Sequence, residues 1–121
     1  MAKNILIVDD SKSMRQMINF TLTENGYTVT EAENGRHGVE MLEEASPELI
    51  ITDINMPEMD GIEFIKSVRQ DDRFKFTPII VLTTESEEAK QAEGKKAGAT
   101  AWIVKPFTPE KLIDVAKKVS G

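Results

Sequence analysis

The chain contains no cysteine and only one histidine, which rules out several common kinds of site. Without cysteine there are no disulfides, no thiolate catalysis and none of the usual structural zinc sites. A single histidine excludes a histidine-rich metal centre. No apolar stretch approaches the length of a membrane span, and the N-terminus lacks the apolar segment of a signal peptide. We therefore expect a cytoplasmic protein without a membrane partner.

Positive charge is scarce as well, since 15 lysines and arginines stand against 21 aspartates and glutamates, for a net charge of −6. This balance argues against nucleic-acid binding, because a phosphate backbone would be repelled. The charge is uneven, and residues 86–121 carry 7 basic and 5 acidic side chains. This segment forms either a solvated lysine-rich surface or a mildly basic docking face for an acidic partner.

The length of 121 residues and the apolar content of 40% allow one domain with a single core. The sequence shows no internal repeat, no linker and no second region of distinct composition. We expect residues 1–121 to form one domain without an output domain, and the protein to be a monomer.

Short unbroken runs of branched apolar residues recur along the chain, and they are typical of strands buried on both faces of a parallel sheet. Residues 28–32 alternate polar and apolar instead, which is typical of an edge strand with one solvated face. The four apolar runs are residues 5–8 before Asp9 and Asp10, residues 49–52 before Asp53, residues 79–82 before Thr83, and residues 102–104 before Lys105.

The segments between the strands have the spacing of amphipathic helices. Ser11 is a suitable N-cap for the first helix, which would present Met14, Met17, Ile18 and Leu22 to the core. Three further helices are expected. One follows the cap Asn34, and one starts at about residue 62 and turns Ile62, Ile65 and Val68 inward. The last follows the cap Thr108 and has Pro109 at its first position.

Two other segments are less regular. Residues 70–75 are expected to form a loop, and Asp60-Gly61 is interpreted as a turn. Residues 87–97 predict a weakly amphipathic helix whose apolar face consists of Ala89, Ala92 and Ala97. Because such small side chains make few contacts, we expect this helix to move.

Five strands alternating with five helices predict an α/β fold of the flavodoxin-like (βα)5 type. It would be a doubly wound parallel sheet of five strands in the order 2-1-3-4-5, with helices on both faces. In such sheets ligands bind outside the carboxyl ends of the strands. The reactive residues that follow the apolar runs should therefore converge on one site.

Three carboxylates at one sheet end repel one another by roughly 3 kcal/mol per pair at about 5 Å and an effective dielectric constant of about 20. They would hold protons or collect a cation, and oxygen ligands favour Mg²⁺. With the ammonium of Lys105 and the hydroxyl of Thr83, this set of groups suits phosphoryl transfer, in which an aspartate itself can be the nucleophile.

Several short motifs occur together in this chain. They are Asp9-Asp10, Asp53 with Met56-Pro57-x-Met59-Asp60-Gly61, Thr83, and Lys105-Pro106-Phe107. This combination resembles the receiver domain of two-component response regulators, over the whole chain. In the absence of an output domain, the chain is most similar to single-domain regulators of the chemotaxis CheY type.

The resemblance implies a role for each matching residue. Asp53 would be the phosphoacceptor, and Thr83 would move toward the phosphoryl group. Lys105 would bind that group, because a cis Lys105-Pro106 peptide bond would direct its side chain back toward the site. Trp102 would be the aromatic switch. The implied Mg²⁺ ligands are Asp10, Asp53 and the backbone carbonyl of Asn55, with Asp9 holding a metal-bound water.

The resemblance also implies partners. A histidine kinase would donate the phosphoryl group, a phosphatase would end the signal, and a downstream protein such as a flagellar motor switch protein would bind the fourth helix, fifth strand and fifth helix. The protein would not be an enzyme beyond its own phosphorylation and dephosphorylation.

Two other interpretations fit parts of the sequence. A Mg²⁺-dependent phosphatase with an aspartate nucleophile also has an aspartate after the first strand, but it typically needs a second one two residues later, where this chain has Ser11. A flavin- or nucleotide-binding module would need a glycine-rich phosphate loop, which does not follow the first strand.

Overall fold

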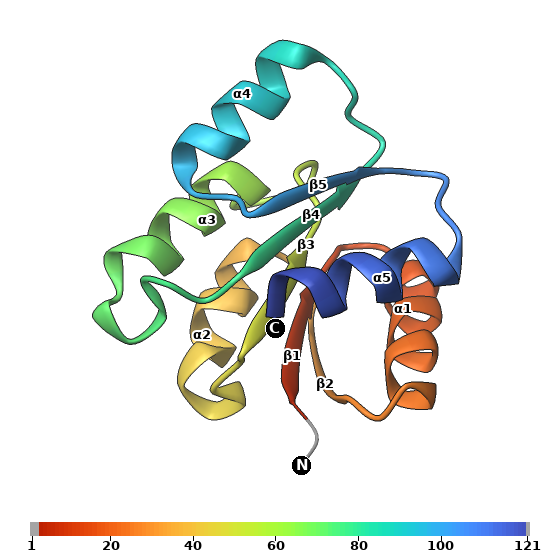
Figure 1. The fold of residues 1–121 in the computed structure, drawn as a ribbon. Helices are drawn as coiled ribbons and strands as arrows, with labels where there is room; N and C mark the ends of the chain where they lie inside the picture. Colours follow the sequence, from red (N-terminus) through yellow and green to blue (C-terminus); the bar gives the residue numbers. More distant parts are fainter. Residues whose placement is uncertain (1–2, 121) are drawn as a thin grey trace.

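A parallel sheet of five strands in the order β2-β1-β3-β4-β5 forms the centre of the molecule in the computed structural model, which describes residues 3–120 (Figure 1). This confirms the predicted flavodoxin-like fold and its strand order. The strands are β1 (Asn4–Val8), β2 (Thr28–Ala32), β3 (Leu49–Thr52), β4 (Ile79–Thr83) and β5 (Ala101–Val104).

Helices cover both faces of the sheet, with α1 and α5 on one side and α2, α3 and α4 on the other (Figure 1). Within residues 3–120, no helix combines the length and the apolarity that a bilayer crossing requires. The helices are α1 (Lys12–Glu24), α2 (Gly35–Ala45), α3 (Gly61–Gln70), α4 (Glu88–Ala97) and α5 (Pro109–Ser120).

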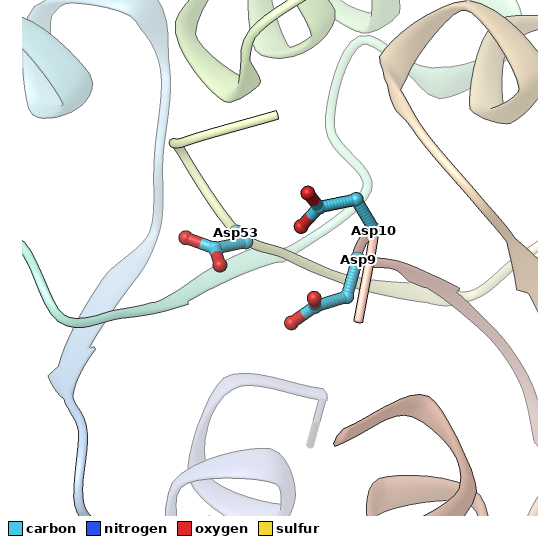
Figure 2. Close-up of side chains that lie close together, drawn as sticks. All are labelled: Asp9, Asp10 and Asp53. Carbon is cyan, nitrogen blue, oxygen red and sulfur yellow. The ribbon is translucent and has the colours of Figure 1, made fainter. Parts of the chain in front are cut away.

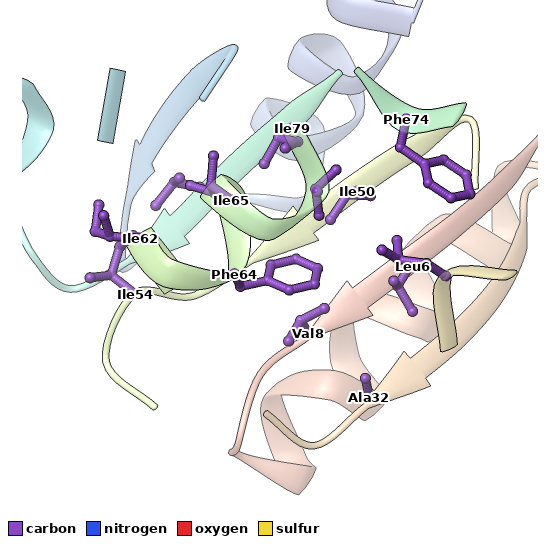
Figure 3. Close-up of a cluster of buried hydrophobic side chains, with 13 residues drawn as sticks. Leu6, Val8, Ala32, Ile50, Ile54, Ile62, Phe64, Ile65, Phe74 and Ile79 are labelled. Atoms are coloured by element: carbon purple, nitrogen blue, oxygen red, sulfur yellow. The ribbon is translucent and has the colours of Figure 1, made fainter. Parts of the chain in front are cut away.

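Two apolar clusters hold the layers together, one on each face of the sheet. Successive side chains of a strand point to opposite faces, so Leu6 and Val8 join the cluster under α2 and α3, while Ile5 and Ile7 join the one under α1 and α5. Phe64 of α3 is fully buried in the first cluster (Figure 3). Every residue of β3 and β4 is buried, which explains why these strands are continuously apolar.

The predicted helix starts are confirmed by side-chain caps. The hydroxyl of Ser11 accepts a hydrogen bond from the amide of Met14 at 3.3 Å, and the side chain of Asn34 accepts one from His37 at 2.8 Å. Thr108 caps α5 in the same way, because its hydroxyl accepts from the amide of Lys111 at 3.1 Å. These caps satisfy amide groups that have no partner within the helix.

Two local predictions are wrong. Met17 was expected to face the core, but it is 43% exposed, because the inward direction of α1 is set by Ile18 and Leu22, four residues apart. Residues 70–75 are not simply a loop, since α3 extends to Gln70 and a 3-10 helix (Asp72–Phe74) follows. Phe74 anchors this short helix in the core.

The apolar face of α4 also differs from the prediction. Ala89 and Ala92 are exposed, Ala97 is partly buried, and the buried residue of this helix is Gly94. The ring of Trp102 lies against Gly94 so closely that an added Cβ would stand 2.5 Å from a ring carbon. A glycine in α4 thus provides the space that the indole on β5 occupies.

Candidate functional site

The carboxyl ends of β1 and β3 bring three aspartates together, as predicted. The two strands are adjacent and parallel, with Val8 beside Thr52, so Asp9 and Asp53 follow at neighbouring positions. Figure 2 shows both side chains with Asp10 beside them. One carboxylate oxygen from each of Asp9, Asp10 and Asp53 lies within 4.8 Å of the others.

Lys105 joins this cluster from the end of β5. Its ammonium donates to Oδ2 of Asp9 at 3.1 Å and to Oδ2 of Asp53 at 3.2 Å, and its side chain is only 11% exposed. The Lys105-Pro106 peptide bond is cis, as the resemblance implied. One nearly buried cation therefore bridges two of the three carboxylates.

Backbone amides hold the second oxygen of each bridged carboxylate. Oδ1 of Asp53 accepts hydrogen bonds from the amides of Ile54 at 2.6 Å and Asn55 at 3.3 Å. Oδ1 of Asp9 accepts from the amide of Ser11 at 2.9 Å. Because Asp9 and Asp53 are buried, these bonds replace the water that the carboxylates lose on folding.

Burial and charge act against each other at this site. Burial raises the pKa of Asp9 above its ordinary value, although the Ser11 amide and the Lys105 ammonium oppose the shift. Burial by itself would lower the pKa of Lys105, but the carboxylates of Asp53 and Asp9 raise it, so this side chain stays charged at neutral pH. Three carboxylates and one ammonium leave an excess of negative charge.

The residues present fit a hard divalent cation. The carboxylate ligand atoms of the cluster are all oxygens, and the exposed side chain of Asp10 leaves the cluster accessible to solvent. Mg²⁺ is usually held by one or two carboxylates and several waters. The cluster therefore has the composition, spacing and charge to bind a metal ion.

Thr83 is the last residue of β4, and Trp102 lies on the neighbouring strand β5, beside Val81. Thr83 is completely buried, and its hydroxyl accepts a hydrogen bond from the amide of Glu85 at 3.2 Å. The indole N–H of Trp102 donates to the backbone carbonyl of Glu85 at 3.0 Å. Both side chains are therefore attached to the same residue of the loop between β4 and α4.

Gly61 supports the site in a way that the sequence did not reveal. The pair Asp60-Gly61 was interpreted as a turn, whereas Asp60 caps α3 through the amide of Glu63 and Gly61 is the first residue of that helix. A Cβ on Gly61 would stand 2.1 Å from the carbonyl oxygen of Asp53. The only signal in the sequence was membership of the motif, because this close approach joins residues eight positions apart.

A model of the response regulator receiver domain matches residues 5–117. The chain belongs to this family. This receiver domain is 47% identical to the chemotaxis protein CheY1 of Helicobacter pylori over 119 residues, which cover 97% of the chain and 96% of CheY1. It is 43% identical to CheY of Thermotoga maritima over 121 residues, covering 99% of each. Its fold matches that of Vibrio cholerae chemotaxis protein CheY4 with a TM-score of 0.94 and 47% identity, over 98% and 99% of the two chains.

Membership of this family favours one of the three interpretations of the sequence. The chain is a receiver domain of the kind found in CheY chemotaxis proteins, and such domains act in phosphorylation-dependent signalling. They are signalling proteins and not classical enzymes, which favours a switch over the phosphatase and flavin alternatives.

Replacing Lys105 tests how strongly its charge holds the acidic cluster. We expect Lys105→Met to lower the free energy of unfolding in EDTA by about 2 kcal/mol, less than the ~3–5 kcal/mol of a fully buried pair because the cluster borders solvent. The loss should shrink as the pH falls. Lys105 holds the pKa of Asp9 down, so that pKa rises further in the variant, and protonation of Asp9 then stabilises the variant more than the unmodified protein. Urea unfolding at several pH values measures both effects.

The matched control is Lys66→Met, because Lys66 is exposed on α3. It makes the same change of charge and should alter stability by less than about 0.5 kcal/mol. Equal stability of the two variants at neutral pH would show that the Lys105 ion pairs contribute nothing measurable.

Proposed function

We propose that this receiver domain is a signalling switch in which Asp53 accepts a phosphoryl group from a histidine kinase in the presence of Mg²⁺. The observation that supports this most directly is the position of Asp53. It is nearly buried and lies within an acidic cluster suited to a cation. It also forms an ion pair with the ammonium of Lys105, a group that can donate a hydrogen bond to a phosphoryl oxygen. Among residues 3–120, only the site around Asp53 combines all three features.

The proposed ligands of Mg²⁺ are the carboxylates of Asp10 and Asp53 and the backbone carbonyl of Asn55, with Asp9 holding a metal-bound water. When bound, the ion neutralises negative charge between the carboxylate and the incoming phosphoryl group. The amides of Ile54 and Asn55 fix one oxygen of Asp53. The loop that carries Asn55 is thereby attached directly to the proposed nucleophile.

In the proposed reaction a carboxylate oxygen of Asp53 attacks the phosphorus of a phosphohistidine. A new oxygen–phosphorus bond forms, the phosphorus–nitrogen bond breaks, and the imidazole leaves and takes up a proton. Lys105 neutralises charge on the transferred group. Its ammonium already contacts Asp53, so it needs to move little to reach a phosphoryl oxygen.

The proposed response begins with two new hydrogen bonds to the phosphoryl group. Bonds from Lys105 and Thr83 would each contribute about 1.5–3 kcal/mol, because one partner is charged. Their sum of roughly 3–6 kcal/mol approaches the ~5.5 kcal/mol needed to shift a two-state equilibrium from 1:99 to 99:1. Binding of a partner to the phosphorylated form would supply the remainder and would stabilise that form in return.

The movement of Thr83 would be transmitted through Glu85. A movement of Thr83 toward the phosphoryl group would displace the hydroxyl that accepts from the amide of Glu85, and Trp102 is bonded to the carbonyl of the same residue. The loop, the indole and α4 would therefore shift together. We propose that the output surface consists of α4, β5 and α5, the region in which the basic excess lies.

The similarity to chemotaxis proteins supports a role in chemotaxis, and we propose that the domain acts there as a cytoplasmic monomer. The proposed downstream partner is a flagellar motor switch protein, and a phosphatase would reset the signal. The acidic net charge of −6 argues against nucleic acid as a partner.

Acetyl phosphate, a small-molecule phosphodonor, tests this function without knowledge of the kinase. With Mg²⁺ we expect the intact protein to gain the mass of one phosphoryl group, and with EDTA to gain none. Because Trp102 is the only tryptophan, its emission should change on the same time course. An adduct of equal yield in EDTA would contradict the role of the metal, and unchanged emission in the phosphorylated protein would contradict the proposed route through Trp102.

A further inference from the structure

Arg15 lies directly behind the acidic cluster, in the first turn of α1. Its side chain is only 12% exposed, although it carries a full charge. Nη1 donates to the backbone carbonyl oxygen of Asp9 at 2.7 Å, and Nε donates to Oε1 of Glu31 at 3.2 Å. A positive charge close to the acidic cluster weakens the attraction of the cluster for a cation, so the position of this guanidinium calls for a structural explanation.

The carbonyl that Arg15 holds belongs to the peptide group between Asp9 and Asp10. A peptide group is planar, so fixing its oxygen also fixes the direction in which the chain leaves toward the Cα of Asp10. The carboxylate of Asp9 has restraints of its own, from the Ser11 amide and Lys105. Within residues 3–120, no hydrogen bond reaches the exposed carboxylate of Asp10, so its position depends on the backbone that carries it.

Glu31 forms an ion pair with Arg15 and so reduces the repulsion that the guanidinium would exert on a cation bound at the cluster. It lies on β2, the edge strand beside β1, and its second oxygen accepts a hydrogen bond from the side chain of Asn19 at 2.7 Å. Its negative charge offsets that of the guanidinium close to the cluster. The rigid fork of an arginine can bind a carbonyl and a carboxylate at once, whereas a lysine ammonium has no such fixed geometry.

We propose that Arg15 is a positioning residue for the cation site: by holding the Asp9-Asp10 peptide, it sets the Asp10 carboxylate where a divalent cation needs it, and Glu31 and Asn19 hold Arg15 in place. This inference rests on the proposed function, because it takes Asp10 as a ligand of Mg²⁺. Residues that orient metal ligands from behind typically change metal affinity by about 10- to 100-fold when removed.

The test is Mg²⁺ binding by Arg15→Met, measured by isothermal titration calorimetry in the absence of any phosphodonor. We expect the dissociation constant to rise about tenfold. The sign of the change is informative, because loss of a positive charge near the cluster would by itself make Mg²⁺ bind more tightly. The matched control is Arg36→Met, which makes the same change of charge at an exposed position of α2 and should not weaken binding.

A second variant, Arg15→Lys, keeps the positive charge but lacks the planar guanidinium that can bind a carbonyl and a carboxylate at once. We expect it to bind Mg²⁺ with intermediate affinity, and it replaces the methionine variant if that protein does not fold. Amide hydrogen exchange in EDTA provides a readout without metal. The amide of Ser11, which donates to Oδ1 of Asp9, should exchange faster in both Arg15 variants than in Arg36→Met, while core strand amides stay protected in all three.

The failure of this inference can be told from the failure of the proposed function. If the unmodified protein binds no Mg²⁺, the proposed metal-dependent function is wrong and this inference is wrong with it. If the unmodified protein binds Mg²⁺ and both Arg15 variants bind it as tightly as Arg36→Met, Arg15 is not a positioning residue and the proposed function stands.

Discussion

Asp53→Asn is expected to abolish phosphoryl uptake completely. An amide has no anionic oxygen to attack phosphorus, so the variant should gain no phosphoryl mass with acetyl phosphate and Mg²⁺. The same variant should be more stable than the unmodified protein in EDTA, because it removes one of three mutually repelling carboxylates. Intact mass measures the first effect, and urea unfolding measures the second. These two results together would show that the Asp53 carboxylate is kept at the site at a cost to the stability of the fold.

Asp60→Asn is the matched control for this experiment. Asp60 lies in the same loop region, and an asparagine there caps α3 about as well as an aspartate does. This variant should take up one phosphoryl group as the unmodified protein does. An adduct that persists in Asp53→Asn, or disappears in Asp60→Asn, would mean that another carboxylate is the acceptor.

The sequence predicted the fold and the proposed site because both depend on local patterns. Apolar runs locate the inner strands, and the parallel sheet brings their carboxyl ends to one edge, so the convergence of Asp9, Asp53 and Lys105 follows from the topology. The helix caps are equally local, since Ser11 and Asn34 bond to amides three residues away. These features need no knowledge of the packing between distant segments.

Two of the features that the sequence did not reveal join distant segments through the shape of a particular contact. The burial of Gly94 depends on the ring of Trp102 on β5, and the role of Arg15 depends on a carbonyl and on Glu31 on β2. Helical periodicity places Met17 near the apolar face of α1, and only the packed structure shows that Met17 lies outside the contact between α1 and the sheet. Periodicity gives the direction of a face but not its width.

Gly61→Ala is the second substitution for which we expect a large effect. Gly61 is the first residue of α3, so helix propensity alone predicts that alanine would stabilise the protein by up to about 1 kcal/mol. The packing predicts the opposite, because the added Cβ would stand 2.1 Å from the carbonyl oxygen of Asp53 and 2.7 Å from the Cα of Ile54. Both obstacles are backbone atoms, and no change of side-chain rotamer can relieve them.

The backbone of the loop that carries Asp53 must therefore move in this variant. We expect the free energy of unfolding to fall by about 3 kcal/mol, at the upper end of the usual range for overpacking. Asp53 should also shift relative to Lys105, so phosphoryl uptake from acetyl phosphate should slow. Urea unfolding and the time course of intact mass test the two effects separately.

Gly26→Ala separates this steric effect from the general cost of replacing a glycine. Gly26 has a φ of +86° and no atom within 4 Å of an added Cβ, so alanine there costs only the ~1–2 kcal/mol of a left-handed backbone. It should leave phosphoryl uptake unchanged, because Gly26 lies between α1 and β2, before the strand begins. If Gly61→Ala is as stable as the unmodified protein, or loses stability while Asp53 is phosphorylated at the normal rate, the contact between Gly61 and the Asp53 backbone does not position the acceptor.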